Sequence, residues 1–333
     1  DMEENEIMEH LKLGIIGVGH LGRVHARLAA SIPTIQLIGV YDIDHDRCQE
    51  VALTCGARAF TSLPGLLEQA DAVCIVTPTE HHFQLGQEAL QAGCHLFIEK
   101  PITSRTYQAR ELLKHAEMAG KTIQVGHIER FNPAFRAIKG QTIAPLFIES
   151  HRLSTFNPRG TDVSVILDLM IHDIDIVLSL MEHRVTSIQA CGVRVVSETE
   201  DIANVRLEFE GKAVANLTAS RISAKDMRKM RIFQNNAYIS LDFLNKKTDI
   251  FSLEDAPGIT PLNPIPVGDI GTGDRARKVL MHQPPFEDIN SLEAELQEFS
   301  LAVINNTPPP VSGQDGLKAL EVAEVILSQI KLP

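Results

Sequence analysis

The sequence predicts an α/β domain with a parallel sheet, followed by an α+β domain with a largely antiparallel, open-faced sheet. Three observations predict it. The 333 residues suffice for about two domains. Up to residue 125, apolar runs of strand length alternate with helical patterns. After residue 126, successive strand patterns with short turns dominate. We expect a loose tail at 1–10 and domains at 11–126 and 127–333.

Almost wholly apolar strand runs in the first domain predict a sheet that helices cover on both faces. The expected strands are Leu11–Gly17, Gln36–Tyr41, Ala72–Thr77, Leu96–Ile98 and Thr122–Val125. The helical patterns between them include Leu21–Ala30, His82–Ala92 and Thr106–Ala119. Gly93 and Gly120 follow two of these patterns, where glycine commonly ends a helix.

The second domain begins with a short helix that Asn132 caps and Pro133 opens. A strand at Leu146–Leu153 and a helix at about 162–181, with apolar residues at helical spacing, come next. Strand patterns follow near 185–196, 201–209, 212–221 and 228–241. The region 255–287 is rich in proline and glycine and predicts a long loop. Capping boxes at Asn290 and Ser312 predict the two final helices.

Composition argues against two classes of function. The formal charge is −12, whereas general nucleic-acid binding needs a surplus of lysine and arginine. No apolar run approaches the ~18 residues that a membrane span requires. The five cysteines include no C-x-x-C pair, which is typical of reduced thiols in a cytoplasmic protein.

Residues 17–22 read Gly-Val-Gly-His-Leu-Gly, a G-x-G-x-x-G pattern that follows a strand and opens a helix. This setting predicts a Rossmann dinucleotide site. Gly17 permits a tight turn, Gly19 lets the backbone approach a pyrophosphate, and Gly22 lets helix and strand pack closely. The N–H groups of the first turn, at His20 and Leu21, would face the phosphates.

Asp42 ends the second strand and lies 20 residues after Gly22. A carboxylate at this position holds a ribose 2′-hydroxyl and repels the 2′-phosphate of NADP. Ile43 follows it in place of arginine. We therefore expect NAD as the cofactor; the alternative is that Asp42 only begins a turn.

Three further motifs occur in a recognisable order: Thr77-Pro78-Thr79-x-x-His82, then Glu99-Lys100-Pro101, then Asp168-x-x-x-His172-Asp173. Together with the Rossmann half, they resemble the glucose–fructose oxidoreductase/inositol dehydrogenase (Gfo/Idh/MocA) family over nearly the whole chain. The resemblance implies an NAD-dependent oxidoreductase acting on a secondary hydroxyl. It also implies cofactor contacts from Thr77, Pro78, His82, Glu99 and Lys100.

Two longer segments resemble a subset of that family, the UDP-N-acetylglucosamine 3-dehydrogenases. They are residues 126–133, Gly-His-Ile-Glu-Arg-Phe-Asn-Pro, and residues 162–175. Enzymes of this subset oxidise the sugar 3-hydroxyl to a ketone ahead of transamination. The resemblance therefore implies a UDP-N-acetylhexosamine as substrate.

Oxidation of an alcohol releases a hydride to the cofactor and a proton that the protein must manage. His172 is the candidate base, because imidazole titrates near neutral pH. Asp168, one helical turn earlier, would orient the imidazole or bind a substrate hydroxyl. Lys100 would stabilise the developing alkoxide or relay the proton. The sequence leaves open whether Lys100 or His172 takes the proton first.

A nucleotide-sugar diphosphate needs cationic partners. The candidates are Arg130, Arg152 and Arg159, because guanidinium groups suit phosphate oxygens. His127, at a strand end, is a further candidate for a substrate contact. No metal-ligand spacing stands out, so we expect no metal site.

Three other functions stay open: an inositol or other free-polyol dehydrogenase, a hydrolase or epimerase that recycles bound NAD, and a non-catalytic NAD-sensing regulator. The uncovered face of the second sheet predicts a homodimer or homotetramer. Val205, Leu207 and Phe209 would be buried there if they lie on that face.

Overall fold

The computed structural model describes residues 10–157 and 163–330. Contacts between Cα atoms divide the chain into two compact units. Unit 1 comprises the residues up to Ile128 together with Asn290–Leu320, and unit 2 comprises Glu129–Ile289 with the residues from Glu321 on. The sequence-based boundaries placed everything after residue 126 in the second domain. The structure instead returns residues 290–320 to unit 1.

Unit 1 is built on a parallel sheet with the strand order β3-β2-β1-β4-β5-β6. The strands are β1 (Leu11–Ile16), β2 (Ile35–Tyr41), β3 (Arg58–Ala59), β4 (Ala72–Ile75), β5 (His95–Glu99) and β6 (Ile123–Gly126). The predicted parallel sheet is confirmed. The order reverses between β1 and β4, and ligands of such sheets bind beyond the carboxyl ends of the strands at this switch point.

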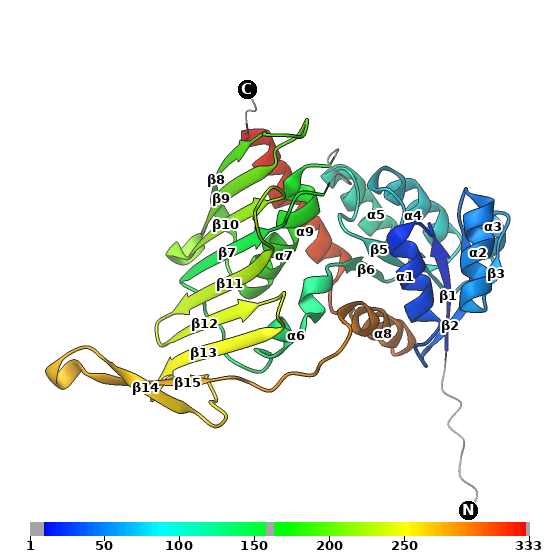
Figure 1. The fold of residues 1–333 in the computed structure, drawn as a ribbon. Coiled ribbons are helices and arrows are strands. Elements are labelled where there is room, and N and C mark those ends of the chain that lie inside the picture. Colours follow the sequence, from blue (N-terminus) through cyan, green and yellow to red (C-terminus); the bar gives the residue numbers. More distant parts are fainter. Residues whose placement is uncertain (1–9, 158–162, 331–333) are drawn as a thin grey trace, which may run out of the picture. The chain divides into compact units, whose positions relative to one another are not determined.

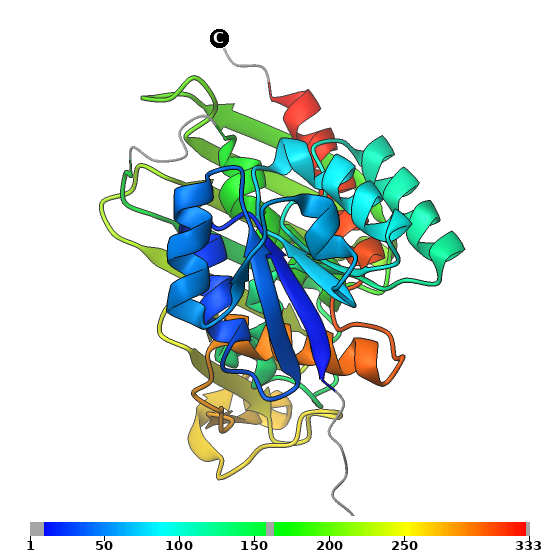
Figure 2. The same cartoon turned by 90° about the vertical axis from the view of Figure 1, so that its right-hand side faces the viewer.

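Helices lie on both faces of this sheet. They are α1 (His20–Ala29), α2 (His45–Cys55), α3 (Leu63–Leu67), α4 (His82–Gln91), α5 (Thr106–Ala119) and α8 (Ser291–Ile304). Figure 2 shows α1 and α2, in blue, on one side of the strands and α4 and α5, in cyan, on the other. Helix α8 joins unit 1 because its apolar side chains enter the core, where Phe299 meets Phe97 edge to face at 5.7 Å. Helix α9 (Gly313–Gln329) begins in unit 1 and ends in unit 2.

Unit 2 carries a nine-stranded sheet in the order β14-β15-β13-β12-β11-β7-β10-β9-β8 (Figure 1). Its strands are β7 (Phe147–Leu153), β8 (Val185–Val193), β9 (Ile202–Phe209), β10 (Val214–Ser220), β11 (Met227–Gln234), β12 (Ala237–Asp242), β13 (Lys247–Leu253), β14 (Ile265–Ile270) and β15 (Arg277–His282). Strands β7 and β10 pair parallel, and the other neighbours pair antiparallel. The largely antiparallel sheet is confirmed.

Shorter elements complete unit 2 and the loops. They are α6 (Pro133–Arg136), α7 (Ile171–Leu180), the π-helical turn η3 (Ile166–Met170), and the 3₁₀ turns η1 (Thr79–His81), η2 (Ile128–Phe131), η4 (Glu210–Lys212) and η5 (Gly273–Arg275). The helix expected at about 162–181 thus begins with a π-helical turn. No helix of the described residues is both long and apolar enough to cross a membrane.

The prediction of a long loop at 255–287 is wrong, because β14 and β15 form a hairpin there. Every residue of β14 is exposed and its register shifts between Pro266 and Gly268. It therefore lacks the alternating burial that marks a strand in a sequence. The expected strand at 228–241 is also wrong as one element, since a tight turn divides it into β11 and β12.

The two faces of the unit 2 sheet differ in character. Helix α7 packs against β7 and β10 on one face. Val205, Leu207 and Phe209 are buried within the chain, so they do not lie on an uncovered face of the sheet. The opposite side of β9 presents polar residues such as Asn204 and Arg206.

Candidate functional site

A cavity of about 730 Å³ lies at the carboxyl ends of β1, β2 and β4 in unit 1. Five residues that the sequence singled out line it: Gly17, Gly19, Asp42, Thr77 and Pro78. Other lining residues were not foreseen, among them Arg47, Ser62, Gln84 and Glu88. Its place at the switch point of the sheet is where a dinucleotide binds in this type of fold.

The glycine-rich turn has the geometry that a pyrophosphate site needs. Gly17 has a φ of +86°, and a Cβ there would lie 2.7 Å from Cγ2 of Thr77. A Cβ on Gly22 would lie 2.0 Å from the carbonyl oxygen of Gly17, so only glycine fits. A Cβ on Gly19 would meet no atom within 4 Å among the described residues, which leaves space in front of the turn.

Helix α1 begins at His20 directly after this turn, and no side chain of the described residues caps this end. The N–H groups of a first helical turn have no partner inside the helix, and they favour an anion. His20 and Leu21 are exposed there. The turn and the helix end together fit the pyrophosphate of a dinucleotide.

Asp42 is a buried carboxylate that faces the cavity. Its oxygens accept from the N–H groups of Val18 at 2.7 Å and Asp44 at 2.9 Å, and from the guanidinium of Arg47 at 2.8 Å. Burial raises the pKa of Asp42, but the bonds from Arg47, Asp44 and Val18 outweigh it and lower the pKa overall. The group is therefore an ionised acceptor, as a ribose hydroxyl requires.

His82 is buried behind the cavity, with 1% of its surface exposed. Its ring nitrogens lie 2.9 Å from the carbonyl oxygen of Thr77 and 3.0 Å from that of Pro101. Burial lowers the pKa of His82. The expected cofactor contact is therefore not supported. His82 ties two turns together, whereas the preceding His81 lines the cavity.

Glu99 is the last residue of strand β5, and Lys100 follows it directly. The Glu99 carboxylate lies 2.9 Å from Nε2 of His25 and accepts the N–H of Lys100 at 3.2 Å. Burial raises the pKa of Glu99, but the bond from His25 and the charge of Lys100 outweigh it, so the pKa falls below its ordinary value. Lys100 is half-buried, and its bond to Pro101 is cis. No role was predicted for His25 from the sequence.

Asp168 lies on the π-helical turn η3 of unit 2, and His172 lies at the start of α7. Both are half-buried. Single π-helical turns inside helices occur frequently at functional sites. Asp168 lines a pocket of about 310 Å³ together with Leu153, Ser154, Thr155, Asn157, Leu169, Arg221, Asp226 and Arg228. This pocket is the candidate substrate site of unit 2.

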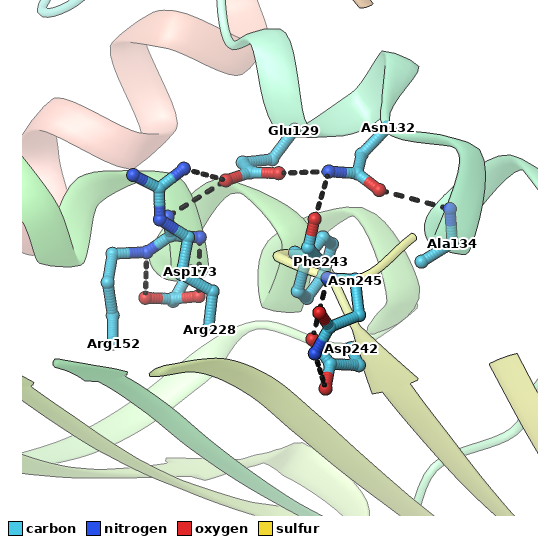
Figure 3. A network of polar contacts seen from close by, with 9 residues as sticks. All are labelled: Glu129, Asn132, Ala134, Arg152, Asp173, Arg228, Asp242, Phe243 and Asn245. Atoms are coloured by element: carbon cyan, nitrogen blue, oxygen red, sulfur yellow. Dashed lines mark hydrogen bonds and ion pairs between the residues drawn. The ribbon is translucent and has the colours of Figure 1, made fainter. Parts of the chain in front are cut away.

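Arg152 is buried in an ion-pair network inside unit 2 (Figure 3). Its Nε and one terminal nitrogen donate to Asp173 at 2.8 and 3.1 Å, and the other donates to Glu129 at 2.8 Å. Burial opposes the charge of Arg152, but Asp173 and Glu129 outweigh it and raise its pKa. Since all three nitrogens are engaged and the residue is 3% exposed, the prediction that Arg152 binds phosphate is wrong.

Two further candidates for anion or substrate contacts, Arg130 and His127, are also held or buried in the fold. Arg130 donates to the buried carboxylate of Asp175 at 2.6 and 2.9 Å, so it too is held inside unit 2. His127 is buried at the end of β6, which argues against a substrate contact. Arg159 lies outside the described residues.

Two arginines that the sequence did not single out line the Asp168 pocket. Arg221 follows β10 and donates to the carbonyl oxygen of Val163. Arg228 begins β11, and its guanidinium is 3.8 Å from Glu129. Arg221 and Arg228 lie near strand ends, and so does Arg152, the penultimate residue of β7, so the sequence offered no signal to separate them.

Comparison with known proteins gives a consistent result. Residues 11–127 match the family model "Oxidoreductase family, NAD-binding Rossmann fold", and residues 136–240 match "GFO/IDH/MocA C-terminal domain". A UDP-N-acetylglucosamine 3-dehydrogenase of Acidithiobacillus ferrooxidans is 38% identical over 317 residues, covering 95% of this chain and 96% of that protein. Its solved structure superimposes with a TM-score of 0.86 at 36% identity, covering 97% and 98%.

Two polyol dehydrogenases are more distant. A scyllo-inositol 2-dehydrogenase of Bacillus subtilis is 30% identical over 237 residues, covering 65% of this chain and 69% of that protein. The structure of a scyllo-inositol dehydrogenase from Lactobacillus casei with bound NAD(H) and scyllo-inositol has a TM-score of 0.75 at 20% identity and covers 97% of both chains. The latter match shows a shared fold.

Proposed function

Because this chain belongs to the Gfo/Idh/MocA family of NAD-dependent oxidoreductases, we propose that it oxidises the 3-hydroxyl of a UDP-N-acetylhexosamine to a ketone. The observation that carries this proposal is the 38% identity to a UDP-N-acetylglucosamine 3-dehydrogenase over 95% of the chain. Identity at this level spans both units, so it includes the substrate side as well as the NAD side. The polyol dehydrogenases are less similar: the scyllo-inositol 2-dehydrogenase of Bacillus subtilis is 30% identical over 65% of the chain, and a myo-inositol 2-dehydrogenase of Thermotoga maritima is 26% identical over 93%.

The residues that would hold NAD are those of the unit 1 cavity. The turn from Gly17 to Gly22 would bind the pyrophosphate, Asp42 the adenosine ribose, and Thr77 with Pro78 the nicotinamide side. When bound, NAD supplies the acceptor for the hydride that leaves the sugar carbon. Everything else in the reaction falls to the side chains of the protein.

The proton of the sugar hydroxyl needs an acceptor. We assign it to the His172 imidazole, with Asp168 binding a neighbouring hydroxyl or orienting the ring. We assign Lys100 to the oxygen, where its ammonium stabilises the charge that develops as the hydride departs. A well-placed base contributes about 10²–10⁴-fold to such a step.

The direct test follows NADH formation with UDP-N-acetylglucosamine, UDP-N-acetylgalactosamine and scyllo-inositol. Lys100→Ala and His172→Ala should each lower kcat by roughly 10²–10⁴-fold. The exposed residues Lys114 and His183 provide matched alanine controls that keep full activity. NADH formed with scyllo-inositol but with neither UDP-sugar would overturn the substrate assignment.

We further propose that Arg228 and Arg221 bind the diphosphate of the substrate, because they line the same pocket as Asp168. A guanidinium on a phosphate contributes chiefly to binding, so Arg228→Ala should raise KM for the UDP-sugar more than it lowers kcat. Arg159→Ala should behave in the same way if Arg159 also contacts the phosphates. An equal fall in kcat at unchanged KM would contradict a binding role for either residue.

We propose that the protein is a homodimer or homotetramer joined through the unit 2 sheet. Support comes from a row of rings across neighbouring strands, in which Phe147, Phe233, Tyr238 and Phe251 follow one another at 4.9–5.8 Å. Phe233 is 38% exposed in one chain. Light scattering should give a multiple of 36.7 kDa for the wild type and a smaller mass for Phe233→Asp.

We also propose the cytoplasm as the compartment of this protein, since all five cysteines are free thiols.

A further inference from the structure

We propose that His25 of α1 is a positioning residue for Lys100, acting through the carboxylate of Glu99. The inference rests on the proposed role of Lys100 and goes beyond it, because His25 lies in no part of the cofactor cavity. It starts from a polar chain in the core of unit 1: Cys74 on β4, His25 on α1 and Glu99 at the end of β5. His25 and Cys74 are wholly buried.

The negative charge of Glu99 determines which atoms donate in the row of polar contacts from Cys74 through His25 to Glu99. The pKa of Glu99 is lowered, so its carboxylate is ionised and can only accept. Nε2 of His25, 2.9 Å away, must therefore carry a hydrogen and donate it. On the other side of the ring, Nδ1 lies 3.3 Å from the Cys74 sulfur. Burial raises the pKa of that thiol well above its ordinary value, so the sulfur keeps its proton.

The Glu99 carboxylate is confined on its remaining sides. A Cβ on Gly126 would lie 3.0 Å from it, so the neighbouring strand leaves no room for another side chain. The His25 ring is itself held edge-on against Phe97, at 5.6 Å between centroids. The second carboxylate oxygen accepts the backbone N–H of Lys100 at 3.2 Å. A fixed carboxylate therefore fixes the backbone from which the lysine side chain starts.

The hydrogen bond from His25 also stabilises the negative charge of Glu99 on the side of the carboxylate that faces the core. If that donor is lost, the carboxylate loses its partner on the buried side, and Lys100 is the next residue whose charge acts on it. The lysine ammonium would then be drawn toward Glu99 and away from the sugar oxygen. Loss of His25 should consequently lower kcat and leave the binding of NAD and sugar almost unchanged.

The test compares three variants: His25→Leu, His25→Gln and the double variant His25→Leu/Glu99→Gln. Leucine fills the space without a donor, whereas the glutamine amide can still donate to Glu99 from near the Nε2 position. We expect His25→Leu to lower kcat by roughly 10–100-fold, the cost of a displacement of about 1 Å, with both KM values nearly constant. His25→Gln should stay close to wild type. The double variant should be no worse than His25→Leu, because the uncompensated charge is gone.

A second readout does not depend on activity. Amine labelling followed by mass spectrometry gives the reactivity of Lys100, with Lys114 as the internal standard. In His25→Leu, Lys100 should label about three- to tenfold more slowly, because a closer carboxylate favours the unreactive ammonium form. Circular dichroism melting of each variant verifies that it is folded.

Equal kcat and equal Lys100 labelling in His25→Leu and His25→Gln would overturn the positioning role. If the wild type oxidises no sugar while His25→Leu still shows the slower labelling of Lys100, the proposed function is overturned and the positioning role stands. If His25→Leu fails to fold, His25→Asn carries the comparison, because its shorter amide places no donor at the Nε2 position and leaves the Glu99 carboxylate charged. Full activity and wild-type Lys100 labelling in a folded His25→Asn protein would then refute the inference.

Discussion

Replacing Arg152 with alanine leaves two buried carboxylates without their guanidinium partner. The side chains of Glu129 and Asp173 are 6% and 3% exposed, and both lie 2.8 Å from Arg152 nitrogens. Asn132 also donates to Glu129, and the half-exposed Arg228 guanidinium lies 3.8 Å from it, so that carboxylate keeps part of its partners (Figure 3). The change therefore removes the buried cation of a compact network and keeps its anions.

The magnitude follows from this burial. Removing one partner of a buried ion pair costs about 3–5 kcal/mol, because the remaining charge is desolvated and uncompensated. For a unit of this size, each kcal/mol lowers Tm by about 2–4 °C, which gives a fall of roughly 6–20 °C. A matched control is Arg231→Ala. Its partner Glu149 is at the surface, with side-chain exposures of 44% and 34%, so the loss should stay below about 1 kcal/mol.

The assay combines urea unfolding with steady-state kinetics at a temperature where both variants are folded. We expect Arg152→Ala to lose stability and to retain KM for the UDP-sugar within about threefold, since its guanidinium does not reach solvent. The reasoning is refuted if Arg152→Ala unfolds like Arg231→Ala while its KM rises tenfold or more. That result would return Arg152 to the substrate site.

Three other changes test the cofactor site and the fold. Asp42→Ala should raise the ratio of kcat/KM with NADP to kcat/KM with NAD by about tenfold or more. The carboxylate that repels a 2′-phosphate is gone, and Arg47 becomes available to bind that phosphate. An unchanged ratio in steady-state kinetics with both cofactors would contradict this. Gly22→Ala should lower the Tm of the cofactor-free protein, since its Cβ would lie 2.0 Å from a backbone oxygen. Gly19→Ala should keep the Tm and weaken NAD binding in calorimetry. Equal Tm values for the two variants would contradict this. Burial opposes the charge of Asp201, yet hydrogen bonds lower its pKa from 3.8 to about 2. The ionised Asp201 should therefore contribute about 2 kcal/mol to the free energy of unfolding above pH 4, and this contribution should be lost as the pH falls through 2. Parallel curves of stability against pH for the wild type and Asp201→Asn over that range would contradict it.

The parts of the fold that the sequence predicted are those with a local signal. Apolar runs between helical patterns predicted the parallel sheet, and the glycines at 17–22 lie where their spacing required. The β14 strand escaped prediction because it is exposed on both faces and contains Pro266 and Gly268. Helix α8 lies in unit 1 because of contacts with residues far away in the sequence, such as Phe97. No local pattern reports such contacts.

The candidate site shows the same limit for charged residues. Arg130 and Arg152 have the right residue type for phosphate, but their partners Asp175 and Asp173 face them from another element of the fold. A sequence gives the charge of a side chain and not the carboxylate that neutralises it. His25 was missed for the same reason, since its contact with Glu99 spans 74 positions.

The most direct test of the proposed activity is a stopped-flow experiment that mixes the enzyme and NAD with UDP-N-acetylglucosamine and follows the absorbance of the reduced cofactor. We expect NADH formation in the wild type, loss of the signal in Lys100→Ala and in His172→Ala, and a 3-keto sugar nucleotide by mass spectrometry. NADH formation at the wild-type rate in either variant, with NAD bound normally, would contradict it.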